Sequence, residues 1–314
     1  MNKHLLTLMG GPRDGLRVPA SILHETIGAL LEGARLATRF AVEGESIRKG
    51  PRPAWLDAAC AIDITALSPG SAVFELEAPT LQDIDTAQFG AGGHRSLFEL
   101  HDHGFGAQTA VDLFGQVLVA VVEGQADDVI ADRALLDTCL RFAKIPGSNY
   151  DGVQLDGLRN REKPLVISPR HVTQIELLRD ETPTPQATRL AGTLDTISAS
   201  RSEVILTLKS GAKVPARLED HDPAALKEFF GKHVVVSGVA HFRPSGRLLL
   251  LDVESITEAT AGDRLFEAVP VARKRTPVAT PLAQDDSTGV SAFFGTWPGD
   301  ESEDDLLNAL QAMG

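Results

Sequence analysis

Three histidines and an aspartate gather in one glycine-rich stretch, as His94, His101, Asp102 and His103. Imidazole and carboxylate groups are zinc ligands, and a His-x-His spacing can place two rings on one side of a strand. No cysteine lies near the group, however, and a catalytic zinc needs a rigid frame of three protein ligands. We interpret these side chains as ordinary loop residues and predict no cofactor; zinc binding by His94, His101 and His103 is the alternative.

Other motifs of catalytic proteins are incomplete in this sequence. Residues 90–93 are glycine-rich, but the Lys-Ser/Thr pair that a phosphate-binding loop requires does not follow them. Ser71 follows a glycine in a hairpin turn, whereas the serine of a hydrolase lies at a strand-to-helix turn. The adjacent Asp127 and Asp128 suit a helix start, where acids favour the helix dipole. We therefore expect a non-enzymatic protein, and an enzyme built on the N-terminal region is the less favoured alternative.

The composition is that of an ordinary globular protein. The 314 residues are 43% hydrophobic and 23% charged, which allows two domains with their own cores. Cys60 and Cys139 lie far apart among apolar residues, which favours buried thiols in a reducing compartment. The first apolar run stops at Gly10 and is too short for a signal peptide, and no run approaches membrane-spanning length. We expect a cytoplasmic protein that does not associate with membranes.

The secondary-structure elements that must position the candidate residues begin with a mixed α+β region, residues 1–179. The hydrophobic patterns of this region do not reveal its topology or its role. Apolar residues recur at helical spacing over 21–41 and predict an amphipathic helix. Alternating residues on either side of a Ser-Pro-Gly turn predict a β-hairpin. The remaining expected elements are hairpin strands at 61–67 and 71–77, strands at 5–9, 165–168 and 172–178, and helices at 109–123 and 127–144.

A proline-containing linker at 180–186 separates this region from a second unit, residues 187–260. Asp222-Pro223 can open a short helix at 224–230. Strands are expected at 190–198, 204–208, 214–218, 234–242 and 248–256. Three strands, a helix and two strands resemble an OB-fold, a five-stranded barrel. The predicted fold class is therefore α+β, with a mixed N-terminal α+β domain followed by a small OB-like β-barrel.

This second unit lacks the composition of a single-strand-binding surface. Such surfaces combine a basic groove with aromatic side chains, whereas residues 187–260 contain nine basic and nine acidic residues. The second and third strands, which form the binding face of OB-folds, hold no aromatic residue. Arg243 and Arg247 flank the last turn and can contact phosphate, although arginines at a tight turn are usually solvated. Nucleic-acid binding is therefore the alternative function, with the acidic end of the chain recruiting proteins.

The net charge of −13 comes largely from residues 285–314, which hold seven acidic residues and no basic one. The preceding stretch, 261–295, is rich in Pro, Thr, Ala and Ser and is typical of a flexible linker. In residues 296–314, Asp300 can cap a helix, and Leu306 and Leu310 share one face. Such a helix is marginal alone and is expected to fold against a partner; a solubilising tail is the alternative.

The same segment contains Trp297-Pro298-Gly299-Asp300-Glu301-Ser302 and resembles the C-terminal signature of antitoxin-like partners of PIN-domain toxins. In that family the tail wraps the toxin, a metal-dependent ribonuclease, and blocks its acidic site. The resemblance implies an interaction protein that binds a PIN-domain ribonuclease. Residues 285–314 contain no Arg or Lys to neutralise the toxin's carboxylates, so we expect inhibition by occlusion. The predicted partner-binding residues, large apolar anchors included, are Phe293, Phe294, Trp297, Asp300, Glu301, Leu306, Leu307 and Leu310.

Overall fold

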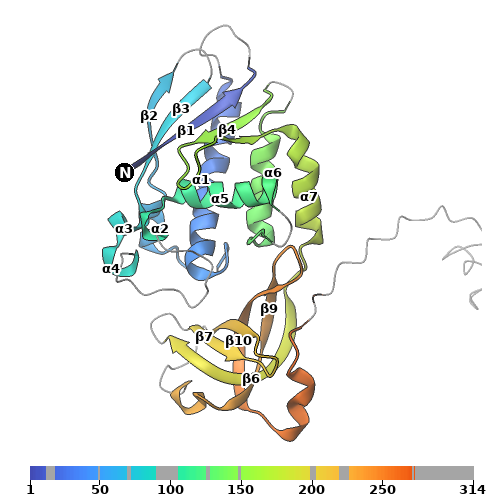
Figure 1. Cartoon of the computed structure of the whole chain (residues 1–314). Helices are drawn as coiled ribbons and strands as arrows, with labels where there is room; N and C mark the ends of the chain where they lie inside the picture. Colours follow the sequence, from blue (N-terminus) through green and yellow to red (C-terminus); the bar gives the residue numbers. More distant parts are fainter. Residues whose placement is uncertain are drawn as a thin grey trace, which may run out of the picture. The chain divides into compact units, whose positions relative to one another are not determined.

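A computed structural model describes residues 1–11, 18–48, 50–68, 72–89, 105–124, 128–147, 150–198, 203–218, 226–270 and 272. These residues contain a five-stranded sheet with helices packed on it, followed by a closed five-stranded barrel (Figure 1). Both belong to one compact unit, residues 1–274. The predicted α+β class with a small OB-like barrel is therefore confirmed.

The N-terminal sheet is built around its first strand. Strand β1 pairs antiparallel with β3 on one side and with β4 on the other, and the full order is β2-β3-β1-β4-β5. His4, Leu6 and Leu8 of β1 are buried because alternate residues face the helices. The predicted hairpin is the β2–β3 pair. The strands are β1 (Asn2–Met9), β2 (Asp63–Ser68), β3 (Ala72–Ala78), β4 (Gly152–Asp156) and β5 (Leu165–Ile167).

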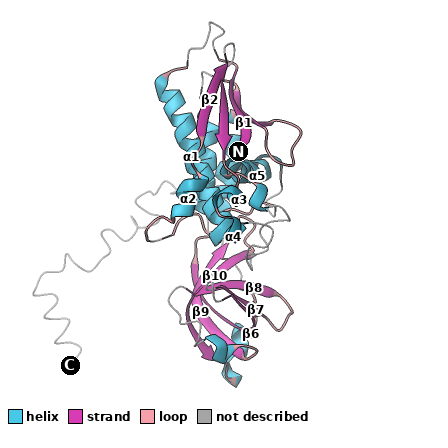
Figure 2. Ribbon diagram, turned by 90° about the vertical axis from the view of Figure 1, so that its left-hand side faces the viewer, coloured by secondary structure: helices cyan, strands magenta, loops and turns pink. Residues whose placement is uncertain are grey.

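The long helix α1 (Ala20–Glu43) runs alongside this sheet, as its apolar periodicity predicts (Figure 2). It approaches α5 closely because Gly33 leaves room for the ring of Phe114; a Cβ at Gly33 would lie 2.3 Å from a ring carbon. Phe114 in turn packs edge-to-face on Phe142 of α6. The other helices are α2 (Ala54–Ala59), α3 (Leu81–Ile84), α4 (Thr86–Phe89), α5 (Ala110–Glu123), α6 (Arg133–Lys144) and α7 (Val172–Glu181), with 3-10 turns η1 (Phe105–Ala107) and η2 (Pro169–His171).

Residues 172–178 form part of helix α7, so the strand predicted there is wrong. The apolar pattern is too short to distinguish the two periodicities. Proline begins the preceding 3-10 turn, where its fixed φ and missing N–H are tolerated, and the Ser168 amide donates to His171 Nδ1 at 3.1 Å. Ile175 and Leu178 then share a buried face at i and i+3, against α6. Packing on a neighbouring helix therefore decides the conformation.

The start of α6 also differs from the prediction. The helix begins at Arg133 rather than near 127, and Asp132 is its N-cap, accepting the Leu135 amide at 2.9 Å. Asp128 precedes the helix, and Asp127 lies outside the described residues. The interpretation of these two acids as a helix start is therefore wrong; a side-chain oxygen at the cap position satisfies the first amides instead.

The barrel closes in the order β10-β8-β7-β6-β9, with β10 and β8 parallel. Its own hydrophobic cluster includes Leu190, Val204 and Leu251. Within the range 224–230, where a short helix is expected, the structure has a 3-10 turn at Lys227–Phe229. Residues 219–225 lie outside the described part. A second 3-10 helix occupies the first part of the stretch expected to be a linker. The elements are β6 (Gln186–Ser198), β7 (Glu203–Thr207), β8 (Lys213–Leu218), η3 (Lys227–Phe229), β9 (His233–Phe242), β10 (Leu248–Glu258) and η4 (Ala261–Phe266).

Candidate functional site

Two groups of predicted site residues fall outside the described part of the chain. Within the residues that are described, no three His, Cys, Asp or Glu side chains gather to hold a metal ion, and no helix is both long and apolar enough to span a bilayer. The metal-site alternative and the partner-binding segment therefore both stay predictions. The residues concerned are His94, His101, His103, Phe293, Phe294, Trp297, Asp300, Glu301, Leu306, Leu307 and Leu310.

Arg243 and Arg247 lie on the β9–β10 turn, as predicted. Their backbones close it: the Arg243 amide donates to the Arg247 carbonyl at 2.8 Å, and Gly246 supplies the positive φ of 82° that the turn needs. The Arg243 side chain is half-buried, whereas Arg247 is exposed. The turn therefore does not present two equally exposed cations to a phosphate backbone.

A buried arginine organises the contact between the barrel and the N-terminal helices. Arg217 is on β8 and lies opposite Asp252 of the parallel strand β10. Its neighbours Ala216 and Leu218 face the barrel core, so strand alternation turns Arg217 outward. Although it faces out of the barrel, Arg217 is only 3% exposed. A charged side chain this deeply buried needs partners.

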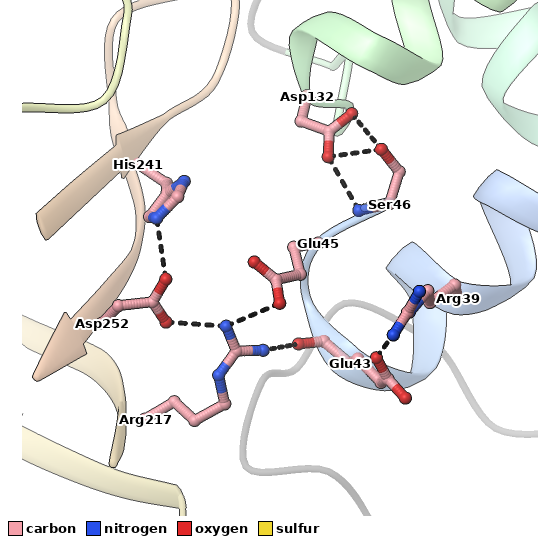
Figure 3. Close-up of polar contacts among 8 residues, drawn as sticks. All are labelled: Arg39, Glu43, Glu45, Ser46, Asp132, Arg217, His241 and Asp252. Carbon is pink, nitrogen blue, oxygen red and sulfur yellow. Dashed lines mark hydrogen bonds and ion pairs between the residues drawn. The ribbon is translucent and has the colours of Figure 1, made fainter. Parts of the chain in front are cut away.

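Arg217 has carboxylate and carbonyl partners from both parts (Figure 3). Nη2 lies 2.7 Å from Asp252 Oδ1 and 2.9 Å from Glu45 Oε1. Nη1 donates to the backbone carbonyl of Glu43 at 2.9 Å. That carbonyl belongs to the last residue of α1, where a cation interacts favourably with the helix dipole. His241 Nε2 completes the group at 2.8 Å from Asp252 Oδ2. We call Arg217, Asp252, Glu45 and His241 the Arg217 cluster.

The chain segment after α1 is fixed from a second direction. Ser46 donates through its backbone amide to Asp132 Oδ2 at 2.7 Å, and its hydroxyl also contacts that carboxylate (Figure 3). Asp132 is the N-cap of α6, so one carboxylate joins the start of α6 to the segment after α1. Within α1, Arg39 Nε lies 2.8 Å from Glu43 Oε2. The end of α1 and the segment after it, which contact Arg217, are therefore also fixed by contacts that do not involve the arginine.

Burial and pairing shift the titration of this cluster in opposite directions. For Asp252, burial raises the pKa, but the hydrogen bond from His241 and the charge of Arg217 outweigh it and lower the pKa. For Glu45, burial dominates over the attraction of Arg217 and raises the pKa. The pKa of Arg217 is itself raised: burial lowers it, but the two carboxylates outweigh that effect. The guanidinium therefore stays charged.

These shifts have opposite consequences for stability. A carboxyl with a lowered folded-state pKa stabilises the fold above its unfolded pKa, and this contribution is lost as pH falls through the folded value. Asp252 belongs to this case. A carboxyl with a raised folded-state pKa costs stability once pH exceeds its unfolded value, and the cost is complete above the folded value. Glu45 belongs to the second case.

The arrangement joins the barrel to the end of α1. OB-folds bind ligands on the face of their second and third strands, which are β7 and β8 here. At one end of that face Glu203 and Arg217 are buried, and at the other Lys213 is exposed. Leu249 and Leu250 of β10 belong to the hydrophobic cluster of the N-terminal helices. The Arg217 end of this face is therefore used for contact within the chain, and the Lys213 end is open to solvent.

The Arg217 cluster is not among the sites predicted from the sequence. The available signal is a charged residue at an outward position of an otherwise apolar strand, as at Arg217 in β8 and Asp252 in β10. Such a residue usually faces water. Nothing local to these strands indicates that the end of α1 covers them.

A cavity of about 460 Å³ lies beside the C-terminal half of α5. Gln116, Val119 and Ala120 line it from the helix, and Leu158 to Arg161 line it from the loop after β4. Arg161 forms a bidentate ion pair with Glu123: Nη2 lies 2.6 Å from Oε1 and Nη1 lies 3.0 Å from Oε2. None of these residues stands out in the sequence, because the two walls come from separate elements.

Comparison with known proteins assigns this chain to no family. No family model matches this chain, and no curated protein matches it. One solved structure that matches is described as U. maydis replication protein A bound to ssDNA. That match has a TM-score of 0.18 and 15% sequence identity, and it covers 28% of this chain and 70% of that chain. A likeness this small carries no argument about function. The OB-like assignment rests on the closed barrel itself.

Proposed function

We propose that this protein is a non-enzymatic interaction protein, antitoxin-like, whose segment 296–314 folds into a groove of a partner protein. The observation that supports this is the use of the β8–β10 face for contact with the end of α1 through Arg217. The part of the barrel surface around Arg217 that contacts α1 is not free for a nucleic acid. The acidic, apolar-striped segment at 296–314 is then the part with binding chemistry of its own.

The partner we propose is a PIN-domain ribonuclease encoded beside this chain. Leu306 and Leu310 would enter an apolar groove, and Trp297 would anchor the segment before the helix. Large apolar side chains in desolvated pockets supply most of the energy of such contacts. The acids from Asp300 to Asp305 favour a groove with a basic rim. Occlusion of the ribonuclease site then follows from the position of the helix.

The test uses the full chain in three forms, co-expressed with the neighbouring PIN-domain protein. One variant carries Leu306→Asp and Leu310→Asp on the apolar stripe. The matched control carries Asn308→Asp and Gln311→Glu, which add the same charge away from that stripe. We expect the wild type and the control to co-purify with the ribonuclease and inhibit RNA cleavage, and the stripe variant to do neither. Equal binding by both variants, or no binding by the wild type, would refute the proposal.

The competing function is a nucleic-acid-binding barrel, which the closed OB-like barrel favours. Binding through Lys213 and Arg247, which are exposed, would depend strongly on salt because phosphate contacts release counterions. The measurement is the affinity of the full chain for single-stranded DNA and RNA at low and moderate salt. Salt-sensitive binding that falls in the Lys213→Gln/Arg247→Gln variant would favour this function over the first.

A further inference from the structure

The cavity beside α5 has one wall formed by a single helical stripe. Gln116, Val119, Ala120 and Glu123 follow one another at i, i+3, i+4 and i+7, so they share a face of α5. Val119 and Ala120 are half-buried and form the apolar part of that wall. The stripe offers an apolar surface bordered by one amide and one carboxylate.

The opposite wall, residues 158–161, is fixed in position. The Leu158 side chain lies so close to α5 that a Cβ at Gly115 would be 2.4 Å from it. The Arg159 amide donates to Asp112 Oδ1 at 2.7 Å, and Asp112 is 1% exposed. Arg161 Nε donates to the Lys163 carbonyl at 2.8 Å. Because the wall is built before any ligand arrives, binding need not bear the cost of ordering it.

The cavity lining holds two arginines, Arg159 and Arg161, and two acidic residues, Glu123 and Asp128. Arg161 is paired with Glu123, so these two groups largely neutralise each other. Arg159 is exposed, and within the described part of the chain its guanidinium contacts only the Ala107 carbonyl, at 3.4 Å, and no carboxylate. A guanidinium has a fixed fork of donors that matches the oxygens of carboxylate and phosphate groups.

Asn160, on the same wall, has an unusual backbone conformation. Its φ is 62°, the one positive φ of a non-glycine residue in the described ranges. Asparagine tolerates this region better than most residues, but glycine adopts it without strain. Asn160 places a side-chain amide at the cavity, which a glycine at this position would not. Backbone strain of this kind often accompanies binding sites.

We propose that this cavity binds a small organic anion. Its carboxylate or phosphate group pairs with Arg159, the amides of Asn160 and Gln116 donate to it, and its apolar body contacts Val119 and Leu158. The volume of about 460 Å³ lies in the range of small-molecule sites. This site is independent of the partner-binding segment and stands or falls separately from the proposed function.

The test is calorimetric titration of the full chain with phenyl phosphate and phenylacetate at millimolar concentration, with benzyl alcohol as the neutral probe. We expect saturable binding of at least one anion and none of benzyl alcohol. Arg159→Gln should weaken anion binding about 10-fold or more, because a hydrogen bond to a charged group is lost. The anion that binds more tightly identifies the head group.

Two further variants separate binding from folding. Asn160→Gly should unfold at the same temperature as the wild type or higher, since glycine relieves the positive φ, yet bind the anion less tightly. Arg52→Gln removes an exposed arginine paired with Asp57, away from the cavity lining, and should bind as the wild type does. The proposal is overturned if neither anion binds, if benzyl alcohol binds as well, or if Asn160→Gly leaves affinity unchanged.

Discussion

Replacing Arg217 with alanine should destabilise the protein severely. The substitution removes the cation that lies 2.7 Å from Asp252 and 2.9 Å from Glu45 and leaves both carboxylates without it. Breaking a buried ion pair by removing one partner costs about 3–5 kcal/mol. The side chains of Asp252 and Glu45 are 25% and 14% exposed, so water partly solvates the remaining charges. We therefore expect the lower end, about 3 kcal/mol.

Thermal unfolding followed by circular dichroism measures this effect. For a chain of 314 residues, about 3 kcal/mol corresponds to a fall in Tm of about 5 °C. The matched control is Arg52→Ala, since Arg52 and Asp57 form an exposed pair with side chains 49% and 59% accessible. Exposed pairs contribute about 0–1 kcal/mol, so this variant should unfold close to the wild type.

A second substitution separates charge from packing. If uncompensated charge is the cause, adding Asp252→Asn to Arg217→Ala should restore part of the lost stability, because one buried carboxylate is removed. If the lost packing of the arginine stem is the cause, the two effects should add. Equal Tm values for Arg217→Ala and Arg52→Ala, or a double variant less stable than either single one, would refute the electrostatic account.

Three further predictions concern stability. Asp252→Asn should reduce the loss of folding stability on acidification, and Glu45→Gln should remove the loss of folding stability that the charged Glu45 causes near neutral pH. Urea unfolding at several pH values measures both effects. The same pH profile in the two variants would contradict the pKa directions. Gly33→Ala should destabilise by about 1–3 kcal/mol, because the new Cβ would lie 2.3 Å from an aromatic ring. Its control is Gly28→Ala on the same helix, where the nearest atom is 3.6 Å away; this should stabilise by about 0.5–1 kcal/mol, and equal shifts would refute the packing argument. Asp132→Ala should lower the free energy of unfolding by about 1–2 kcal/mol because the α6 cap is lost, and by a further amount because the bonds to Ser46 are lost. A change below about 0.5 kcal/mol would contradict the assigned role.

The sequence by itself determined the elements whose signal is local. The period of apolar residues marks α1 and α5, and alternation marks the β2–β3 hairpin and the strands of the barrel. These elements agree with the prediction because each pattern is long, or is bounded by glycine and proline. Where the pattern is short, as over 172–178, the prediction is wrong, and burial of Ile175 and Leu178 against α6 decides for a helix.

Only the tertiary structure decided which charged residues are buried and where a cavity forms. Arg217 and the carbonyl that it contacts are 174 positions apart in sequence, and the two walls of the cavity come from α5 and the loop after β4. Whether a charge on an outward strand position meets water or another element depends on packing between parts of the chain. The periodicity of a single strand is the same in both cases. The local sequence therefore specifies the strand, and the neighbouring element specifies the role of its side chains.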